Sequence, residues 1–152
     1  MLLETRRLED QLSRSVRGEA WHGPALQELL RDDSFKRAVA RPLEGAHGIW
    51  EIVLHVTAWM DTARRRLEGT AVELSPAEDW PEIAAPTEAA WKTALGRLET
   101  AHEKLRGAIA ALDPERLDEP VPGKPYSFYF LLHGVIQHNL YHAGQIAILK
   151  KA

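Results

Sequence analysis

The sequence predicts an all-α protein, an antiparallel four-helix bundle with short extra helices. Four long segments carry apolar residues at steps of three and four, the spacing that places them on one face of a helix. The chain lacks the alternation of apolar and polar residues that is typical of a half-buried strand. Connections of intermediate length, several of them rich in proline and glycine, separate the four segments. We therefore expect amphipathic helices packed around a shared core.

Length and composition indicate a single domain over residues 1–152. The chain of 152 residues is 45% hydrophobic and 27% charged, which suits one globular core and is too short for two. Its formal net charge is −3, and no long run of lysine or arginine follows one face. A surface that binds phosphate backbones is therefore not expected, and nucleic acid is not an expected partner.

The chain contains no cysteine, which excludes disulfides, thiolate-bound zinc and a cysteine nucleophile. A metal site would then use nitrogen and oxygen ligands. The amino terminus is charged from Glu4 onward and lacks the apolar core of a signal peptide, and no apolar run approaches the length of a membrane span. We therefore expect a cytoplasmic protein with no membrane partner.

The first long helix is predicted from about Leu2 to Arg17. Its apolar stripe is imperfect and consists of Leu2, Leu8, Leu12 and Val16. Two short helices are expected next, one with the sequence ALQELL after Pro24 and one with the sequence FKRAVA, capped by Ser34. Pro42 ends the second of these.

A second long helix is predicted from about Gly48 to Leu67, with Gly69 as its C-cap glycine. Gly48 followed three residues later by Glu51 is a capping box in which glycine replaces serine or threonine. Because glycine retains most of the benefit of an N-cap, Gly48→Ser is expected to raise stability by a few tenths of a kcal/mol.

The second half of the chain supplies two more long helices. Residues 70–86 are predicted to form a long loop with one helical turn that begins at Ser75. A third long helix is expected from about Thr87 to Leu112, and an Asp-Pro pair ends it. After a proline-rich connection, Ser127 is predicted to cap a final helix that runs to Lys150.

Two histidines of the final helix lie four residues apart on its apolar face. That face consists of Leu131, Val135, His138, His142, Gln145 and Leu149. At this spacing the Cβ atoms of His138 and His142 are about 5–6 Å apart, so both imidazoles can reach one metal ion. Asn139 stands where a zincin has glutamate, which excludes that class of site.

A third histidine shares the apolar face of the second helix. That face consists of Ile52, His55, Trp59 and Ala63. Four-helix bundles build metal sites from side chains that point inward on facing helices. We therefore predict a metal site formed by His55, His138 and His142. Hydrogen-bonded core histidines without a metal are the alternative.

The remaining four histidines are not predicted to bind this metal. His133 lies five residues before His138, about 140° around the helix, and therefore points away from the pair. His22 and His47 are close to turns, where surface or capping roles are expected. His102 lies beside the apolar stripe of the third helix, without a neighbouring motif.

Several motifs carry a resemblance to a known family. They are GAHGIWEIVLHVTAW in the second helix, DWP in the long loop and LLHGVIQHNLYHAGQIAILKK in the final helix, with EAWHGPALQELL as a further match. These motifs resemble the DinB superfamily of four-helix metalloproteins, in the branch close to YfiT-like metal-dependent hydrolases. The likeness covers nearly the whole chain and places the family's metal ligands on His55, His138 and His142. It departs from this branch at Gly48, where serine is usual.

The resemblance implies a divalent metal ion as cofactor. Zinc, nickel, iron and manganese all remain open, because each accepts imidazole ligands. Members of the superfamily include thiol S-transferases that use low-molecular-weight thiols, and a maleylpyruvate isomerase. The implied function is therefore a metal-dependent transferase or hydrolase with a small-molecule substrate. A non-catalytic metal-binding protein with a stress or sensor role is the alternative, because family membership alone does not choose a reaction.

Three further residues and the state of assembly complete these expectations. Glu51, one turn before His55, is the candidate general base for hydrolysis, although its place in the capping box explains it as well. A thiol transferase does not need this base. Tyr141 and Gln145 are candidates for contacts to the bound histidines or the substrate, with simple packing as the alternative. Because bundles of this family often pair, and because the chain has five tryptophans, we expect a homodimer.

Overall fold

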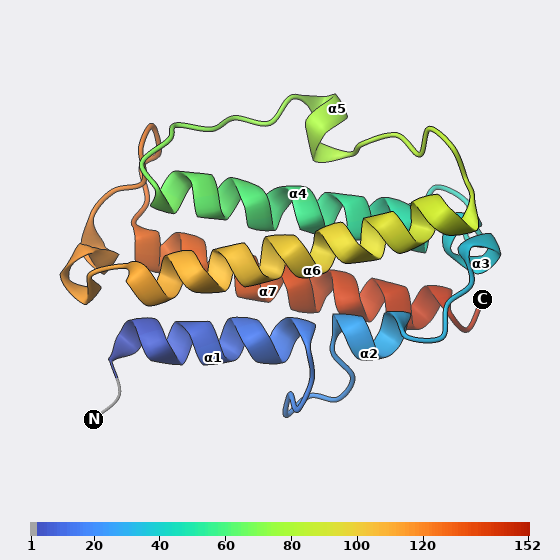
Figure 1. Cartoon of the computed structure of the whole chain (residues 1–152), viewed down its shortest axis with the longest axis horizontal. Helices are drawn as coiled ribbons and strands as arrows, with labels where there is room; N and C mark the ends of the chain where they lie inside the picture. Colours follow the sequence, from blue (N-terminus) through green and yellow to red (C-terminus); the bar gives the residue numbers. More distant parts are fainter. Residues whose placement is uncertain (1–2) are drawn as a thin grey trace.

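The computed structural model describes residues 3–152, which form helices and their connections. The four long helices are α1 (Glu4–Val16), α4 (Ile49–Leu67), α6 (Glu88–Ala111) and α7 (Phe128–Leu149). Shorter elements are α2 (Leu26–Leu30), α3 (Phe35–Val39), α5 (Pro76–Asp79) and the 3-10 helix η1 (Pro114–Asp118). The predicted all-α bundle with short extra helices is confirmed. The antiparallel arrangement expected for its long helices does not hold for α4 and α6, which are parallel (Figure 1). Leu2, which was assigned to the first apolar stripe, lies outside the described residues.

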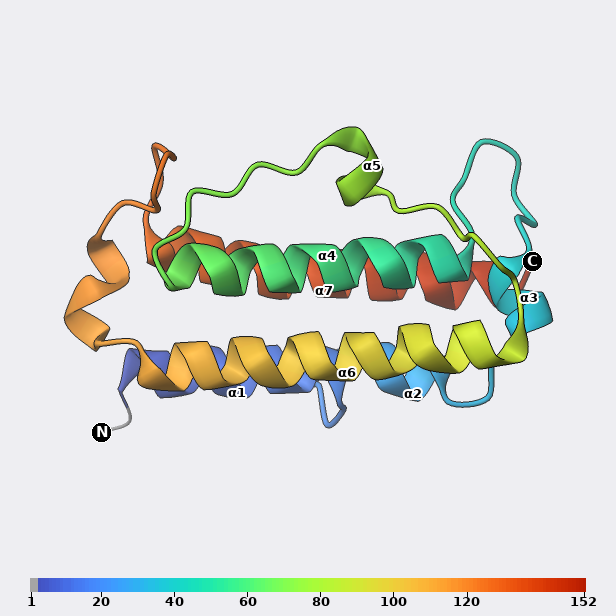
Figure 2. The same ribbon diagram turned by 45° about the horizontal axis from the view of Figure 1, so that its top comes forward.

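The long helices pack in two layers. Helices α4 and α7 form one layer, and α6 forms the other together with α1 and α2 (Figures 1 and 2). Helices α1 and α7 run in one direction along the bundle, and α4 and α6 run in the opposite direction (Figure 1). Because α4 and α6 are parallel, the chain between them returns along the whole bundle. This crossover carries α5 over the layer of α4 and α7 (Figure 2).

Among residues 3–152, four helices begin at a residue whose side chain accepts a hydrogen bond from the backbone amide three positions later. These N-cap residues are Ser34, Ser75, Thr87 and Ser127. Such a bond satisfies an amide that has no partner within the helix. The caps predicted at Ser34 and Ser127 are therefore confirmed, and Ser75 begins the single helical turn predicted in the long loop.

The predicted effect of Gly48→Ser is wrong. Gly48 is the N-cap of α4, with an ordinary extended backbone at φ −78° and ψ 169°, and its amide donates to Glu51 Oε2 over 2.8 Å. A Cβ atom at position 48 would lie only 2.5 Å from the carbonyl oxygen of Ala40. Glycine is therefore needed at this position because the end of α3 approaches it closely, and serine would force that connection to shift.

The core lies between the two layers and is built from the predicted apolar stripes. Side chains with no more than 1% exposure from all four long helices meet there, among them Leu12, Met60, Leu105 and Leu132. His102 is also fully buried, and neither of its ring nitrogens has a hydrogen-bond partner among residues 3–152. Burial, together with the charge of Arg17, lowers the pKa of His102 to about 4. His102 is therefore a neutral core residue.

No helix within residues 3–152 combines the length and the apolar character that crossing a membrane requires.

Candidate metal centre

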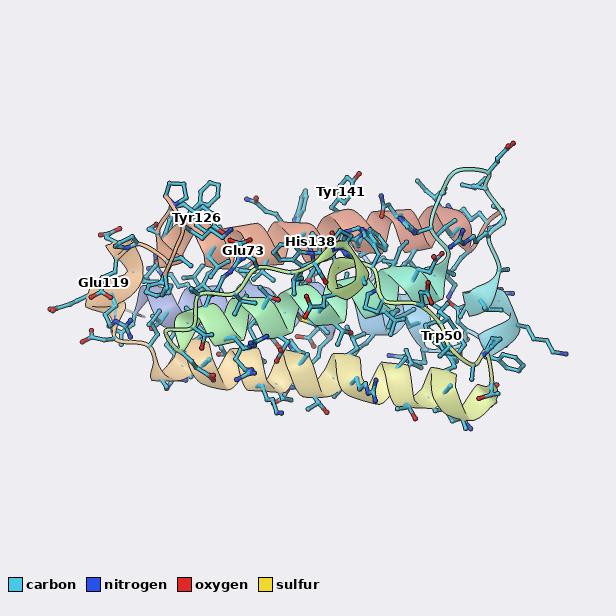
Figure 3. The ribbon with its side chains drawn as sticks, turned by 90° about the horizontal axis from the view of Figure 1, so that it is seen from above. Trp50, Glu73, Glu119, Tyr126, His138 and Tyr141 are labelled. Atoms are coloured by element: carbon cyan, nitrogen blue, oxygen red, sulfur yellow. The ribbon has the colours of Figure 1, made fainter. Side chains whose placement is uncertain are left out.

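The three histidines of the predicted site meet between α4 and α7. His138 Nε2 lies 2.9 Å from His55 Nε2 and 3.1 Å from His142 Nε2. His55 comes from α4, and the other two come from consecutive turns of α7. His138 lies beneath the α5 crossover (Figure 3). One nitrogen of each ring therefore faces the same point, and the three rings together could hold a metal ion.

Oxygen acceptors determine which nitrogen of two of these rings carries hydrogen. His55 Nδ1 lies 2.7 Å from the backbone oxygen of Asp79, and His142 Nδ1 lies 2.6 Å from Gln145 Oε1. Because each oxygen can only accept, each Nδ1 donates its hydrogen. The lone pair of each neutral ring is then on Nε2 and points at His138.

This arrangement leaves a conflict that a cation would resolve. A neutral His138 can donate from Nε2 to only one of its two neighbours, so at least one pair of nitrogens faces lone pair to lone pair. Bonds of about 2.0–2.1 Å to a tetrahedral ion would separate such nitrogens by about 3.3 Å. The observed separations of 2.9 and 3.1 Å are close to that value. The donor set therefore fits one bound metal ion.

Burial keeps His138 and His142 in the form that binds metals. Burial, together with the charges of His142 and His55, lowers the pKa of His138 to about 3. Burial also lowers the pKa of His142, although its hydrogen bond to Gln145 opposes the shift. Both rings are consequently neutral near pH 7, and proton competition for their nitrogens is weak.

Two residues of the α5 crossover complete the surroundings of His55. Asp79 Oδ1 lies 3.0 Å from His55 Nδ1 and accepts a hydrogen bond of 2.7 Å from Trp59 Nε1. The ring of Trp80 stacks between two imidazoles, 3.9 Å from His55 and 3.6 Å from His47. The crossover therefore holds the outer side of the site in place.

The role of Asp79 was not predicted from the sequence, although the DWP tripeptide was one of the motifs that carried the family resemblance. Trp80 stacks directly on His55, a proposed metal ligand, so it contributes to the site as well as to the loop. His47, for which a surface or capping role was expected, is 45% exposed at its side chain and stacks on Trp80.

Two cavities adjoin the three histidines. The first has a volume of about 390 Å³, lies along the groove between α4 and α7, and includes His55 and His138 in its walls. The second has a volume of about 450 Å³ and includes His142, Gln145 and Trp80. A ligand in either cavity would therefore reach the nitrogens that face the proposed metal.

Glu51, the candidate general base, is engaged in other contacts. It accepts hydrogen bonds from Arg41 and from the Gly48 amide, and His47 Nδ1 lies 3.4 Å away. Burial raises the pKa of Glu51, but the hydrogen bonds from Arg41, Gly48 and His47 outweigh burial and lower it overall. A carboxylate held in this way is a poor proton acceptor, and its contacts are those of a helix cap.

The other residues considered from the sequence lie as follows. Gln145 contacts a proposed ligand directly, whereas Tyr141 is 67% exposed and presents its ring at 5.2 Å from that of His142. His133 packs against Tyr129 and is not part of the cluster.

A second group on α6 also has the composition of a metal site. Glu99, His102 and Glu103 place potential ligand atoms within 4.8 Å of one another. The guanidinium of Arg17 already bridges the two carboxylates, however. We therefore assign no metal to this group.

Comparison with known proteins identifies the family. A family model described as the DinB superfamily matches residues 20–146. The chain belongs to the DinB superfamily. The resemblance to this superfamily noted in the sequence is thereby confirmed, and the match spans all three clustered histidines. Searches of curated proteins and of solved structures found no match.

Proposed function

We propose that this DinB protein is a metal-dependent enzyme that acts on a small molecule. His55, His138 and His142 would hold one divalent ion, and zinc, nickel, iron and manganese all suit imidazole ligands. The observation that carries the proposal is the convergence of three Nε2 atoms while oxygen acceptors hold the Nδ1 atoms of two rings. This is the arrangement by which proteins orient histidine ligands.

Three protein ligands leave at least one position for water or substrate, which is the layout of a catalytic site. When bound, the ion would supply a Lewis acid that lowers the pKa of a water or a thiol. The chain's own residues orient the ligands and shield them. Asp79 and Gln145 hold two rings in the required tautomer, and Trp80 covers one face of His55.

The two cavities favour a transferase over a hydrolase. A transfer reaction needs places for two substrates, and each cavity reaches a different part of the histidine cluster. Hydrolysis would instead require a base to take a proton from water, and Glu51 is occupied by Arg41 and the helix cap. We therefore propose transfer of a low-molecular-weight thiol, with the thiol in the cavity beside His142 and Gln145.

The test is to load the purified protein with each of the four metals and to measure metal content and turnover. We expect one metal per chain and conjugation of a small thiol to an electrophile. Ester and amide substrates test hydrolysis in parallel. If a fully loaded protein turned over none of these substrates, the enzyme proposal would fail, and the non-catalytic stress or sensor role would replace it.

Alanine variants test the ligand assignment. Replacing His55, His138 or His142 should leave a two-histidine site that binds metal much more weakly, while the apolar core still folds. His133→Ala is the matched control and should keep the metal, because this residue is not part of the cluster. Metal stoichiometry measures metal binding, and circular dichroism measures folding. Full metal in His55→Ala together with loss of metal in His133→Ala would show that the assignment is wrong.

A further inference from the structure

A buried arginine lines the cavity that includes His55 and His138. Arg66 is only 2% exposed. It lies on α4, eleven residues after His55, a separation of three helical turns that brings it back to nearly the same face. Its guanidinium is therefore further along the same groove as the proposed metal ligands, and both line one continuous cavity.

Arg66 forms no ion pair among residues 3–152, and Glu73, whose pKa the charge of Arg66 helps to lower, is paired with Lys124 instead. Its Nε and Nη2 donate to the backbone oxygen of Val72 over 3.2 and 2.7 Å, and its Nη1 donates to the Tyr126 hydroxyl over 3.0 Å. A guanidinium has five N–H groups, so two remain without an acceptor in this part of the chain. The ring of Trp59, 5.6 Å from the guanidinium carbon, stabilises the charge but does not neutralise it.

Three arginines that are more exposed than Arg66 do form ion pairs. Arg41 and Arg64, which are more exposed, bind carboxylates, and Arg106 binds Glu9. A buried charge is normally paired, because removal from water is otherwise strongly unfavourable. An arginine that is almost fully buried, unpaired by any acid and lining a cavity therefore indicates that the anion comes from a ligand.

The walls between the two ends of the cavity are apolar and leave room for an organic group. Ala63, Leu131 and Val135 line this part. At Gly134, a Cβ atom would meet nothing within 4 Å, so the groove is open there. Tyr126 and His138 lie at separate points along the α7 side of the bundle (Figure 3). Polar groups thus lie at both ends of an apolar passage.

We infer that this cavity binds a small organic acid, with its carboxylate at Arg66 and Tyr126 and its apolar body against Trp59. The two free N–H groups of Arg66 and the hydroxyl hydrogen of Tyr126 match the lone pairs of one carboxylate. That the other end of the acid reacts at the histidine cluster rests on the proposed function, whereas binding of the acid does not.

The test uses 3-phenylpropionate and its amide, which share a shape and differ in charge. Binding to metal-free protein is measured by calorimetry, so that no carboxylate can bind to a metal instead. We expect the acid to bind at least tenfold more tightly than the amide. Arg66→Gln should abolish this preference, and Arg66→Lys should retain part of it. Equal binding of acid and amide to the unaltered protein, or a preference that survives in Arg66→Gln, would overturn the inference.

A second pair of variants covers the case in which replacing Arg66 prevents folding. Gly134→Leu should fill the passage and block the acid. Gly96→Leu is the matched control, because Gly96 is also a helical glycine with nothing within 4 Å of a Cβ atom, and it lies outside the cavity. Equal binding of the acid by both variants would place it elsewhere and overturn the inference.

Metal content separates this inference from the proposed function. If the protein bound no metal and yet preferred the acid, the enzyme proposal would fail and the acid site would stand. If metal and turnover were present without the preference, only the acid site would fail. A preference seen only after metal loading would assign the carboxylate to the metal and would also overturn the acid site.

Discussion

The tautomers of the clustered histidines depend on single oxygen acceptors. Gln145 provides the only side-chain acceptor to His142 Nδ1 among residues 3–152, whereas His55 Nδ1 is within reach of two oxygens of Asp79. Loss of one acceptor would therefore disturb the tautomer of His142 more than that of His55. His142 and Gln145 are three residues apart, a spacing that predicts a shared face of the helix, so this contact could be expected from the sequence.

The first prediction concerns Gln145. Gln145→Leu should weaken metal binding by about 10- to 100-fold, the usual effect of removing a partner behind a histidine ligand. Gln145→Glu should retain the affinity, because a carboxylate also accepts from Nδ1. Competition titration with a chelator measures the change. Gln137→Leu, an exposed position of the same helix, is the control, and an equal effect there would contradict the role of Gln145.

The second prediction concerns His102 and pH. Between pH 6.5 and 4 the unfolded chain binds a proton at His102 and the folded chain does not, so stability is full above pH 6.5 and falls as the pH drops toward 4. This pKa difference corresponds to a loss of about 3 kcal/mol from the free energy of unfolding. Burial is the main cause; Arg17 and Arg106 act in the same direction, and Glu99 and Glu103 oppose it.

Urea denaturation of the metal-free protein from pH 7 to 4 checks this prediction against His102→Leu. The variant should lose less stability over this range, because leucine fills a similar volume without a titrating group. Parallel curves for the two proteins would show that His102 is protonated in the folded state. The fully buried position of His102 could not be read from the edge of the apolar stripe, because depth in the core depends on how α1 and α4 pack on α6.

At the scale of elements, the long helices could be predicted and their directions could not. Apolar spacing and polar caps are local properties, and both are present in the sequence. The parallel arrangement of α4 and α6 depends on the crossover, which leaves little periodic signal. For the same reason the contact between Asp79 and His55, 24 residues apart, could not be foreseen. Arg66 could have been noticed, because eleven residues from His55 is nearly a whole number of turns.

The junction of α3 and α4 gives the third prediction. Gly48→Ala should destabilise the protein by more than about 1 kcal/mol, because its Cβ would overlap the Ala40 carbonyl oxygen and the backbone would have to move. Gly96→Ala, in an open position of α6, should instead stabilise by up to about 1 kcal/mol through helix propensity. Chemical denaturation compares the two variants. Equal stabilisation by both would mean that the α3–α4 connection adjusts freely.

For the whole molecule, the expected homodimer remains a prediction, and the structure suggests the surface to test. Four of the five tryptophans are at least partly buried within the chain, so the number of tryptophans does not support pairing. Instead, α7 exposes Phe130, Tyr141 and Ile148, with exposures of 64%, 67% and 62%. Separations of eleven and seven residues place all three within about 20° of one line along the helix. An apolar stripe of this kind on an outer helix is typical of an interface.

We therefore propose that two copies pair through this face of α7, related by a twofold axis as in most homodimers. Ile148→Glu should convert the dimer into a monomer, because pairing would bury an unpaired carboxylate from each copy in an apolar interface. Trp21→Glu, which also introduces a charge at a fully exposed aromatic but on the α1–α2 connection, should leave the dimer intact. Light scattering at micromolar concentration distinguishes these states. The mass of a single chain for the unaltered protein would contradict pairing, and a monomer only in Trp21→Glu would move the interface to that connection.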